Sequence, residues 1–366
     1  MTEIKNTPLY HEHVRLKALM APFAGWNMPI HYGSILDEAK HTRSAASIFD
    51  TSHMGEFIVR ERPDRSSLDH VVTTPVLKMK NNRCRYGLLL NYDGKILDDF
   101  IVYRITEDEW MLVVNAANEE RDYLAIRQGL SSGDLIENIS AQTVKIDIQG
   151  PASLEVMKSI VGEEIKKLAY YGFDYYKFLG GQYLVSRTGY TGELGFEIYI
   201  DSRKGVELWH ELMKHPSVRP AGLGARDILR LEMGYPLYGH EFTEETTPLD
   251  GGMERFLDMD KDFIGKEALV KQQERGVRRR LIGFVIDGRR TPRRENRIIS
   301  GTSDAGFVTS GVFSPHLNIG IGMGYIDEGL SGAGKEIHID TGKGQIRAII
   351  EQVPFLKQTS IKYSEV

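Results

Sequence analysis

Residues 86–115 read YGLLLNYDGKILDDFIVYRITEDEWMLVVN, and this stretch decides the fold class. Three runs rich in β-branched and aromatic residues are separated by two turn signals, the dipeptide Asp93-Gly94 and the polar run TEDE. Strands joined by connections this short pair antiparallel. The stretch therefore predicts a three-stranded antiparallel meander.

The middle run carries two adjacent acids, Asp98 and Asp99. Successive side chains in a strand point to opposite faces, so the two carboxylates cannot share a face. If either face is buried, an acid is buried with it, which costs free energy unless a partner compensates. The pair therefore marks a candidate site.

The composition is that of a globular protein with room for a large core. The chain has 366 residues, of which 41% are hydrophobic and 27% charged. A formal net charge of -5 argues against general nucleic-acid binding, which depends on an excess of Lys and Arg. No apolar run is long enough to cross a bilayer, and the start MTEIKNTPLY lacks the apolar core of a signal peptide. These features predict a cytoplasmic protein that binds neither nucleic acid nor membrane.

Helix signals precede the meander. Thr7-Pro8 predicts a first helix that extends to Met20, and Ser34 predicts a second helix that runs toward Ile48. After the meander, the strand signals YLVSR and FEIYI are followed by an amphipathic helix around Trp209.

The composition shifts near Arg275, beyond which the chain consists of strand-like pieces divided by glycines: LIGFVI, GFVTSGVF, EIHID and IRAII. We therefore expect an α+β protein in which residues 1–274 form one region and residues 275–366 form a small all-β domain.

Three features suggest ligand chemistry that we do not expect. GLSGAGKE at residues 329–336 has the spacing of a phosphate-binding loop, but the IHID that follows predicts a strand and not the required helix. His11 and His13 stand two apart, so they cannot face one metal on a helix, and we expect His13 to be packed and hydrogen-bonded. Cys84 is the single cysteine, so zinc sites built on paired cysteines and internal disulfides are excluded. We expect no metal and no nucleophilic role for Cys84.

Ten motifs in order along nearly the whole chain carry a resemblance to a known family. They are FAGWNMP, FDTSHMGEF, GKILDDFIVYR, VVNAAN, IDIQGP, SRTGYTGELGFE, GLGARDILRLE, YPLYG, DFIGKEAL and TSGVFSP. The sequence resembles the T-proteins, the aminomethyltransferases of the glycine cleavage system. The resemblance implies a multi-domain fold with a ferredoxin-like antiparallel part and a C-terminal β-barrel, in which an inner subdomain spans about residues 54–139 and the two parts of the first region interleave. It also implies transfer of the methylene of an aminomethyl group, held on the lipoyl arm of H-protein, to tetrahydrofolate with release of ammonia.

The resemblance gives Asp99 the catalytic role, because the second Asp of the ILDD motif is catalytic in T-proteins. A carboxylate suits a reaction that passes through a cationic, iminium-like species, since a fixed negative charge stabilises that cation. Pairing about the Asp93-Gly94 turn sets Leu88 opposite Asp99 and Tyr86 on the same face. Asn115 can reach that face if the next turn has the right length. For Asp98 we expect an ordinary polar position on the opposite face.

The resemblance also supplies a set of folate-binding residues. Glu197 alone reads as a solvent-facing strand residue, but the acid of GFE binds the pterin in T-proteins, where one carboxylate meets two parallel donors. Aromatic faces can stack on the flat ring, and the family places two tyrosines there. The expected folate-binding residues are Glu197, Tyr86, Asn115, Tyr170, Tyr190, Arg226 and Met54.

An arginine-rich stretch suggests a docking surface. Residues 274–297 hold nine arginines against three acids in a chain of net negative charge. We expect four of them to dock the acidic lipoyl carrier, namely Arg289, Arg290, Arg293 and Arg294.

Two alternatives remain open from the sequence. One is a folate-dependent demethylase of the same fold that acts on a small methylated amine or sulfonium compound. The other is a non-catalytic folate-binding protein of that fold, whose KGCYxGQE signature is absent because the corresponding stretch here is KDFIGKEA.

Overall fold

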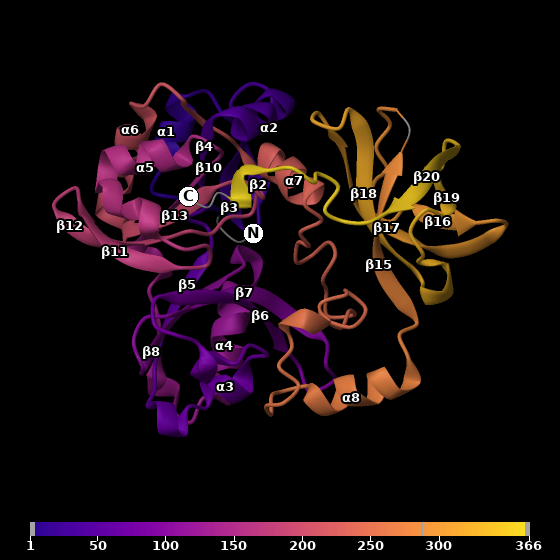
Figure 1. The fold of residues 1–366 in the computed structure, drawn as a ribbon, viewed down its shortest axis with the longest axis horizontal. Helices are drawn as coiled ribbons and strands as arrows, with labels where there is room; N and C mark the ends of the chain where they lie inside the picture. The colour runs from indigo at the N-terminus through magenta and orange to yellow at the C-terminus, as the bar shows by residue number, and fades with distance from the viewer. Residues whose placement is uncertain (1–3, 287, 363–366) are drawn as a thin grey trace.

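Four β-sheets organise the computed structural model, which describes residues 4–286 and 288–362. A six-stranded sheet, a five-stranded sheet and a closed barrel surround a common centre, and a small three-stranded sheet lies near the N-terminus (Figure 1). Helices pack on the two large open sheets. The predicted α+β class with a C-terminal β-barrel is thus confirmed. Within the described ranges, no helix is long and apolar enough to cross a membrane.

The predicted meander supplies three adjacent strands of the five-stranded sheet, beginning at one edge. Its strand order is β6-β7-β8-β5-β9, and all neighbours are antiparallel. The strands are β5 (Gly55–Arg60), β6 (Arg83–Leu90), β7 (Ile96–Arg104), β8 (Glu109–Val114) and β9 (Ile136–Asn138). Leu88 pairs with Asp99 as predicted, so the turn at Asp93-Gly94 sets the expected register.

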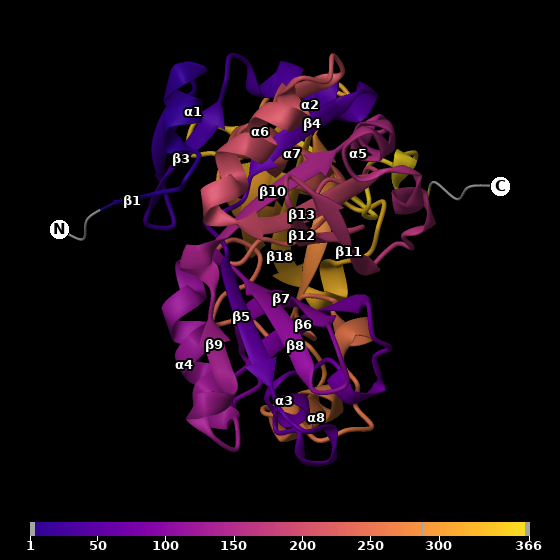
Figure 2. The ribbon, with the colours of Figure 1, turned by 90° about the vertical axis from the view of Figure 1, so that its left-hand side faces the viewer.

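Both faces of this sheet are covered. One face packs against α3 (Leu68–Val71) and α4 (Glu119–Gly129) through a cluster that includes Phe57, Leu112 and Ile126. The other face packs against the six-stranded sheet, where Tyr103 and Met111 join Tyr199 in one buried cluster. The two large sheets therefore stand one above the other, as Figure 2 shows.

The six-stranded sheet has the order β11-β12-β13-β10-β4-β14. Its strands are β4 (Ala46–Asp50), β10 (Thr143–Gln149), β11 (Phe173–Phe178), β12 (Gly181–Ser186), β13 (Gly195–Asp201) and β14 (Val218–Pro220). Helices α5 (Ser153–Val161) and α6 (Gly205–Met213) cover one face, and α2 (Ile35–Ser44) and α7 (Leu223–Glu232) pack against Phe49 on the other. The amphipathic helix predicted around Trp209 is α6, whose Trp209 is fully buried.

Two helix predictions near the N-terminus extend too far. The first helix, α1 (Tyr10–Arg15), ends before Met20, which lies in a strand of the small sheet. That sheet consists of β1 (Lys5–Asn6), β2 (Leu19–Phe23) and β3 (Trp26–His31). The helix capped by Ser34 ends at Ser44, because Ala46–Asp50 is taken up by sheet pairing as β4. Tertiary pairing overrides the helical spacing in both places.

The C-terminal barrel closes in the order β15-β18-β17-β16-β19-β20. Its strands are β15 (Arg279–Ile286), β16 (Arg297–Ser300), β17 (Ser303–Ser314), β18 (Ile319–Asp327), β19 (Glu336–Asp340) and β20 (Gln345–Glu351). A last helix, α8 (Lys266–Arg275), precedes it. The barrel packs on the first region through Leu231 of α7, which contacts Ile321 and Met323.

The structure gives GLSGAGKE, His13 and Cys84 structural surroundings. The GLSGAGKE stretch leads into strand β19, so it is a turn and not a phosphate loop. His13 is fully buried between Asp50, at 2.8 Å from its Nε2, and the Tyr32 hydroxyl, at 2.8 Å from its Nδ1. Burial raises the pKa of the Cys84 thiol well above its usual range, which favours an inert side chain.

Candidate active site

Asp99 lies on β7 at the centre of a small hydrogen-bonded group. The Tyr86 hydroxyl on β6 donates to Oδ2 at 3.0 Å, and the Asn115 amide donates to Oδ1 at 2.8 Å. Asn115 follows directly after β8, so the meander alone brings these three side chains together. Each is half-buried.

The surroundings of Asp99 shift its pKa toward neutral pH. Burial and then the neighbouring charge of Asp98 raise the pKa of Asp99 to about 7, while the hydrogen bonds from Tyr86 and Asn115 act in the opposite direction. A carboxyl group with this pKa is half ionised near neutral pH. It can therefore both oppose a developing cation and take up a proton.

Asp98 lies on the opposite face, as alternation predicts, but it is not an ordinary polar position. It is fully buried and accepts the Asn115 backbone N–H at 3.0 Å and the amides of Asn115 and Asn118 at 2.9 Å each. The face that was expected to tolerate a polar residue packs under α4. The ordinary reading of Asp98 was therefore wrong.

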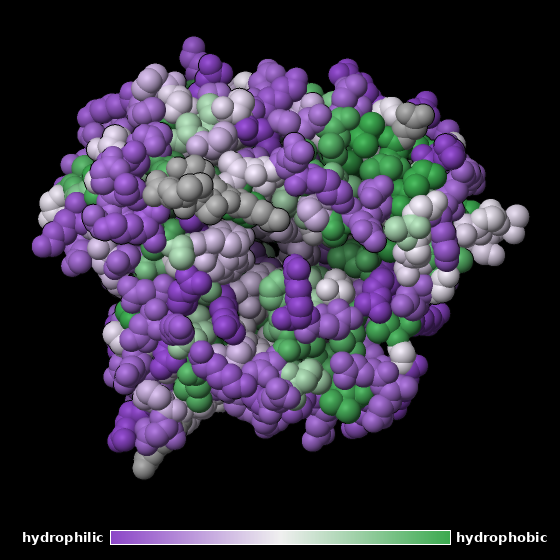
Figure 3. Space-filling view, viewed as in Figure 1, coloured by the Kyte–Doolittle hydropathy of each residue, from purple (hydrophilic) through white to green (hydrophobic). Residues whose placement is uncertain are grey.

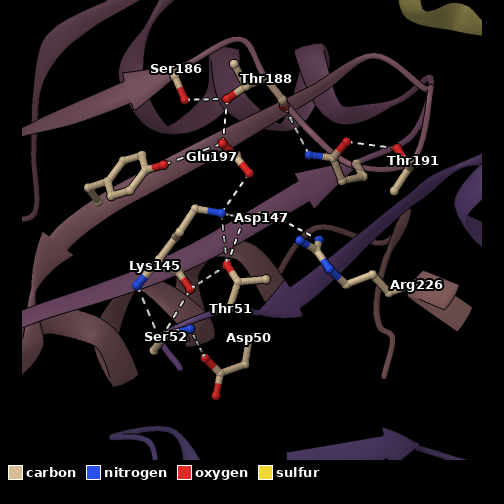
Figure 4. A network of polar contacts seen from close by, with 12 residues as sticks. Asp50, Thr51, Ser52, Lys145, Asp147, Ser186, Thr188, Thr191, Glu197 and Arg226 are labelled. Carbon is tan, nitrogen blue, oxygen red and sulfur yellow. Dashed lines mark hydrogen bonds and ion pairs between the residues drawn. The ribbon is translucent and has the colours of Figure 1, made fainter. Parts of the chain in front are cut away.

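Glu197 belongs to a second group, which is built on β10 and β13 of the six-stranded sheet. It is buried, so the reading as a solvent-facing strand residue is excluded. The Lys145 ammonium lies 2.7 Å from Glu197 Oε1 and 2.6 Å from Asp147 Oδ1, and Figure 4 shows it between the two acids. Glu197 Oε2 accepts the Thr188 hydroxyl at 2.6 Å and the Tyr103 hydroxyl at 3.3 Å.

Arg226 adds a second cation to this group. Its Nη1 lies 2.9 Å from Asp147 Oδ2, and Thr51 donates to Asp147 Oδ1 at 2.8 Å (Figure 4). Burial disfavours the charged forms of Asp147 and Lys145, but the ion pairs dominate. Lys145 and Arg226 lower the pKa of Asp147, and Asp147 and Glu197 raise the pKa of Lys145. Two acidic and two basic side chains thus alternate within one buried group.

Three tyrosines extend from Arg226. The guanidinium lies 4.9 Å from the ring centroid of Tyr190, and Tyr190 stacks on Tyr235 at 5.8 Å with an interplanar angle of 26°. Tyr235 is in turn hydrogen-bonded to Tyr170, which is exposed. Flat aromatic faces therefore stand beside the ionic cluster.

The two groups face each other across the centre of the molecule. Burial raises the pKa of Tyr190, and the charge of Asp99 adds to that rise. Arg226 of the ionic group acts on the same pKa, so Tyr190 lies near both polar groups. The pKa of Tyr86 is likewise raised by burial and by the charges of Asp99 and Tyr190. Figure 3 shows a narrow hollow near the middle of the face, where the sheets and the barrel meet.

The remaining predicted residues lie at other places. Met54 is half-buried and packs at the boundary between the two large sheets. The four docking arginines are all exposed in the segment between β15 and β16. They do not take part in either polar group. Across residues 4–286 and 288–362, no cluster of His, Cys, Asp and Glu has the arrangement of a metal site.

Lys145 and Asp147 belong to the ionic group although neither was predicted from the sequence. Lys145 and Asp147 alternate with Ile146 and Ile148 in KIDIQ, which is the pattern of a strand with one polar face. That pattern could have identified a polar face, although not the partner that neutralises it.

Comparisons with known proteins agree with this architecture. The family description "GCVT N-terminal domain" matches residues 9–261, and "Glycine cleavage T-protein C-terminal barrel domain" matches residues 279–357. Proteins named aminomethyltransferase from Thermoanaerobacter sp. and Halothermothrix orenii are 39% and 40% identical, covering 98% and 96% of this chain and 99% and 100% of theirs. The crystal structure of glycine cleavage system aminomethyltransferase T from Bartonella henselae superposes with a TM-score of 0.91 at 30% identity, covering 97% of this chain and 99% of that one.

The fold, with a buried acidic hairpin facing an ionic cluster, is that of a one-carbon transferase. The chain belongs to the glycine cleavage T-protein family. Enzymes of this family use tetrahydrofolate as a co-substrate.

Proposed function

We propose that the protein transfers the methylene of an aminomethyl group on the lipoyl arm of H-protein to tetrahydrofolate. The carbon–sulfur and carbon–nitrogen bonds of the aminomethyl thioether break, and two carbon–nitrogen bonds to the folate form. The two folate N–H protons are accounted for in the released ammonia and the lipoyl thiol. The curated relatives favour this reaction over the demethylase and over a non-catalytic folate binder.

The observation that carries the proposal is the environment of Asp99. Its half-buried carboxylate is held by Tyr86 and Asn115 and has a pKa of about 7. In the ionised form it opposes the positive charge that develops on the transferred carbon, in a setting preorganised by its two donors. It can also hold a folate amine and receive its proton. Asp99 is thus proposed as the catalytic residue.

The second group fits a flat heterocycle with a polar edge. The stacked faces of Tyr190 and Tyr235 offer a surface for a ring, and Glu197 offers a carboxylate for adjacent N–H donors. Both carboxylate oxygens of Glu197 already accept hydrogen bonds. The Thr188 hydroxyl can turn to Ser186, whose Oγ lies 2.6 Å away, which frees an acceptor position for the pterin edge. We therefore propose Glu197, Tyr190, Tyr170, Arg226 and Met54 as folate-binding residues, together with Tyr86 and Asn115.

The carrier surface is proposed from charge. A cleft of about 970 Å³ between α8 and the barrel is lined by six cations and four acids, whereas the whole chain has a net charge of -5. Arg294 lies in this cleft, and Arg289, Arg290 and Arg293 are exposed in the same segment of chain. A local excess of positive charge attracts an acidic partner and accelerates its encounter. We propose these four arginines as the docking surface for lipoylated H-protein.

The test of the reaction is ammonia release from aminomethylated H-protein with and without tetrahydrofolate. We expect release that depends on tetrahydrofolate and forms methylenetetrahydrofolate in equal amount. Absence of this dependence, with a small methylated amine serving as the better donor, would point to the demethylase instead.

The docking surface is tested by reversing the charge of Arg293 and Arg294. The double variant should raise the KM for the carrier several-fold at low salt and leave kcat nearly unchanged, because rim charges act mainly on association. The matched control reverses Lys166 and Lys167, two adjacent lysines in the 3₁₀ segment Glu163–Lys167. An equal effect of both pairs would assign the change to net charge and not to docking.

The cytoplasmic location and the absence of a metal stay predictions from the sequence.

A further inference from the structure

The buried acid behind the catalytic strand has an acidic partner of its own. Asp122 of α4 is fully buried, and no described side chain or backbone N–H donates to either of its carboxyl oxygens. Its carboxyl group nevertheless lies within hydrogen-bonding reach of Asp98. Two carboxyl groups can form a hydrogen bond only if one of them carries a proton.

The proton resides on Asp122. Burial and the charge of Asp98 raise the pKa of Asp122 to about 11, and Arg121, whose Nε lies 3.7 Å from Oδ1, offsets only part of that rise. Burial also raises the pKa of Asp98, but its hydrogen bonds with Asp122, Asn115 and Asn118 act in the opposite direction, because all of them favour its charged form. Asp122 is therefore the member of the pair that holds a proton more tightly.

Asn115 connects this pair to the catalytic carboxylate. Its Nδ2 donates to Asp98 Oδ1 at 2.9 Å and to Asp99 Oδ1 at 2.8 Å. Its backbone N–H donates to the other oxygen of Asp98 at 3.0 Å. The orientation of the Asn115 amide is thus fixed by Asp98 from behind, and Asp99 receives its hydrogen bond as a consequence.

We propose that Asp98 and Asp122 are a proton-sharing pair of positioning residues, which hold Asn115 against Asp99 and keep one negative charge directly behind it. The inference rests on the aminomethyl-transfer function proposed above. Neither residue touches substrate in this arrangement. Their role is to set how much of Asp99 is ionised and where its lone pairs point.

Several groups face Asp99 and bear on its titration. Tyr86 from β6 donates to it, and Tyr190, which lies between β12 and β13, shares its electrostatic environment. Asp98 raises its pKa, and Asp122 from α4 responds to its charge. Arg121 of α4 is the cation beside Asp122.

The test compares the pH dependence of turnover in variants expected to act in opposite directions. Asp98→Asn removes the charge behind Asp99 and sets an amide N–H against the Asn115 backbone N–H. We expect turnover to fall about tenfold and the acid limb of the pH profile to move about one unit lower. Tyr86→Phe removes a donor that favours the ionised form, so its acid limb should move to higher pH. A role confined to stability would leave the acid limb in place in both folded variants and overturn the proposal.

Asp122 supplies a second test that holds even if Asp98→Asn fails to fold. Asp122→Asn keeps an N–H donor directed at Asp98, whereas Asp122→Leu keeps the volume and removes the donor. We expect the asparagine variant to recover most of the turnover that the leucine variant loses. Equal loss in the two variants would contradict a hydrogen-bonding role for Asp122.

Infrared difference spectroscopy separates this inference from the proposed reaction. In the unliganded protein well above neutral pH, Asp122→Asn should remove one carbonyl stretch of a protonated carboxyl group. An unchanged spectrum would overturn the proton-sharing pair. If the native protein releases no ammonia from aminomethylated H-protein, the proposed function is wrong. The pKa of Asp99 can still be measured by infrared spectroscopy in the unliganded native protein and in Asp98→Asn, and this comparison decides whether Asp98 controls the charge of Asp99.

Discussion

Two groups of acidic side chains lie on facing sheets of this molecule. They differ in the partners of the carboxylates and in the direction of the pKa shifts. On β10 and β13, Asp147 and Glu197 are matched by Lys145 and Arg226, and the pKa of Asp147 is lowered. On the meander, Asp99 accepts from the Asn115 amide and the Tyr86 phenol, and Asp98 accepts from Asn115 and lies against the Asp122 carboxyl group. There the pKa of Asp99 is raised to about 7.

The difference separates two kinds of site. Acids that are paired with cations stay ionised at any ordinary pH and form a fixed binding surface. An acid held by neutral donors beside a like charge remains close to its titration point, so it can exchange a proton during a reaction. The ionic cluster therefore suits recognition, and the meander suits chemistry.

The largest expected effect comes from unbalancing the ionic cluster. Lys145→Met leaves Asp147 and Glu197 buried with Arg226 as their remaining cation. Removing one partner of a buried ion pair typically destabilises a protein by about 3 to 5 kcal/mol. Urea denaturation should show a lowered free energy of unfolding of that order.

The matched control for this prediction is Lys167→Met. Lys167 pairs with Glu164 on the surface, where both side chains are largely exposed. The urea concentration at the unfolding midpoint of Lys167→Met should equal that of the native protein. A Lys145 variant as stable as this control would show that the cluster is not an interdependent ionic unit.

The next effect is on turnover. Asp99→Asn keeps the size of the side chain and one acceptor oxygen, and the Tyr86 hydroxyl can reverse to accept from the new amide. Removing one preorganised electrostatic contributor commonly costs about a hundredfold to a thousandfold in kcat. Turnover should therefore collapse while the thermal transition and folate binding persist. A loss of less than about tenfold in the folded variant would remove Asp99 from the catalytic role.

A smaller effect is expected on folate affinity. Glu197→Gln retains an oxygen for Lys145 but replaces the acceptor proposed for the pterin edge with a donor. Leaving ligand donors unpaired costs about 1 to 3 kcal/mol of binding free energy. Calorimetry with a stable formyl analogue of tetrahydrofolate measures this change. Unaltered affinity would assign Glu197 to the support of Lys145 alone.

The two groups should also differ in how stability depends on pH. Asp99 has a raised pKa, so the folded state binds its proton more tightly, and stability is lost as pH rises from about 4 to about 7, by at most about 1.4 kcal/mol per pH unit. Asp147 has a lowered pKa, so its contribution is present above about pH 4 and is lost as pH falls. Asp99→Asn should therefore flatten the decline of the melting temperature between weakly acidic and neutral pH. An identical decline in both proteins would show that Asp99 is not the titrating group.

The smallest effect should come from Thr51. Its hydroxyl donates to Asp147, and valine has nearly the same shape. Thr51→Val should lower the free energy of unfolding by about 1 kcal/mol, since the two cations still hold Asp147. Measured turnover should barely change. A loss as large as that of Lys145→Met would mean that the hydroxyl, and not the ion pairs, keeps the cluster charged.

The local order of the meander follows from the sequence alone. Alternation placed Asp98 and Asp99 on opposite faces, and the Asp93-Gly94 turn fixed Leu88 opposite Asp99 and Tyr86 beside it. These facts follow from strand geometry and turn length, which involve residues close together in the chain. The strand-like pieces beyond Arg275 likewise predicted a β domain, because their pattern repeats locally.

The groups that surround each acid follow from tertiary contacts. Lys145 meets Glu197 across 52 residues and Arg226 meets Asp147 across 79, and no sequence period marks either contact. Asp98 changed from an ordinary polar position to a buried acid because α4 packs over its face and brings Asp122 against it. Desolvation and charge proximity set the pKa of a carboxyl group, and both depend on neighbours in space and not on neighbours in the chain.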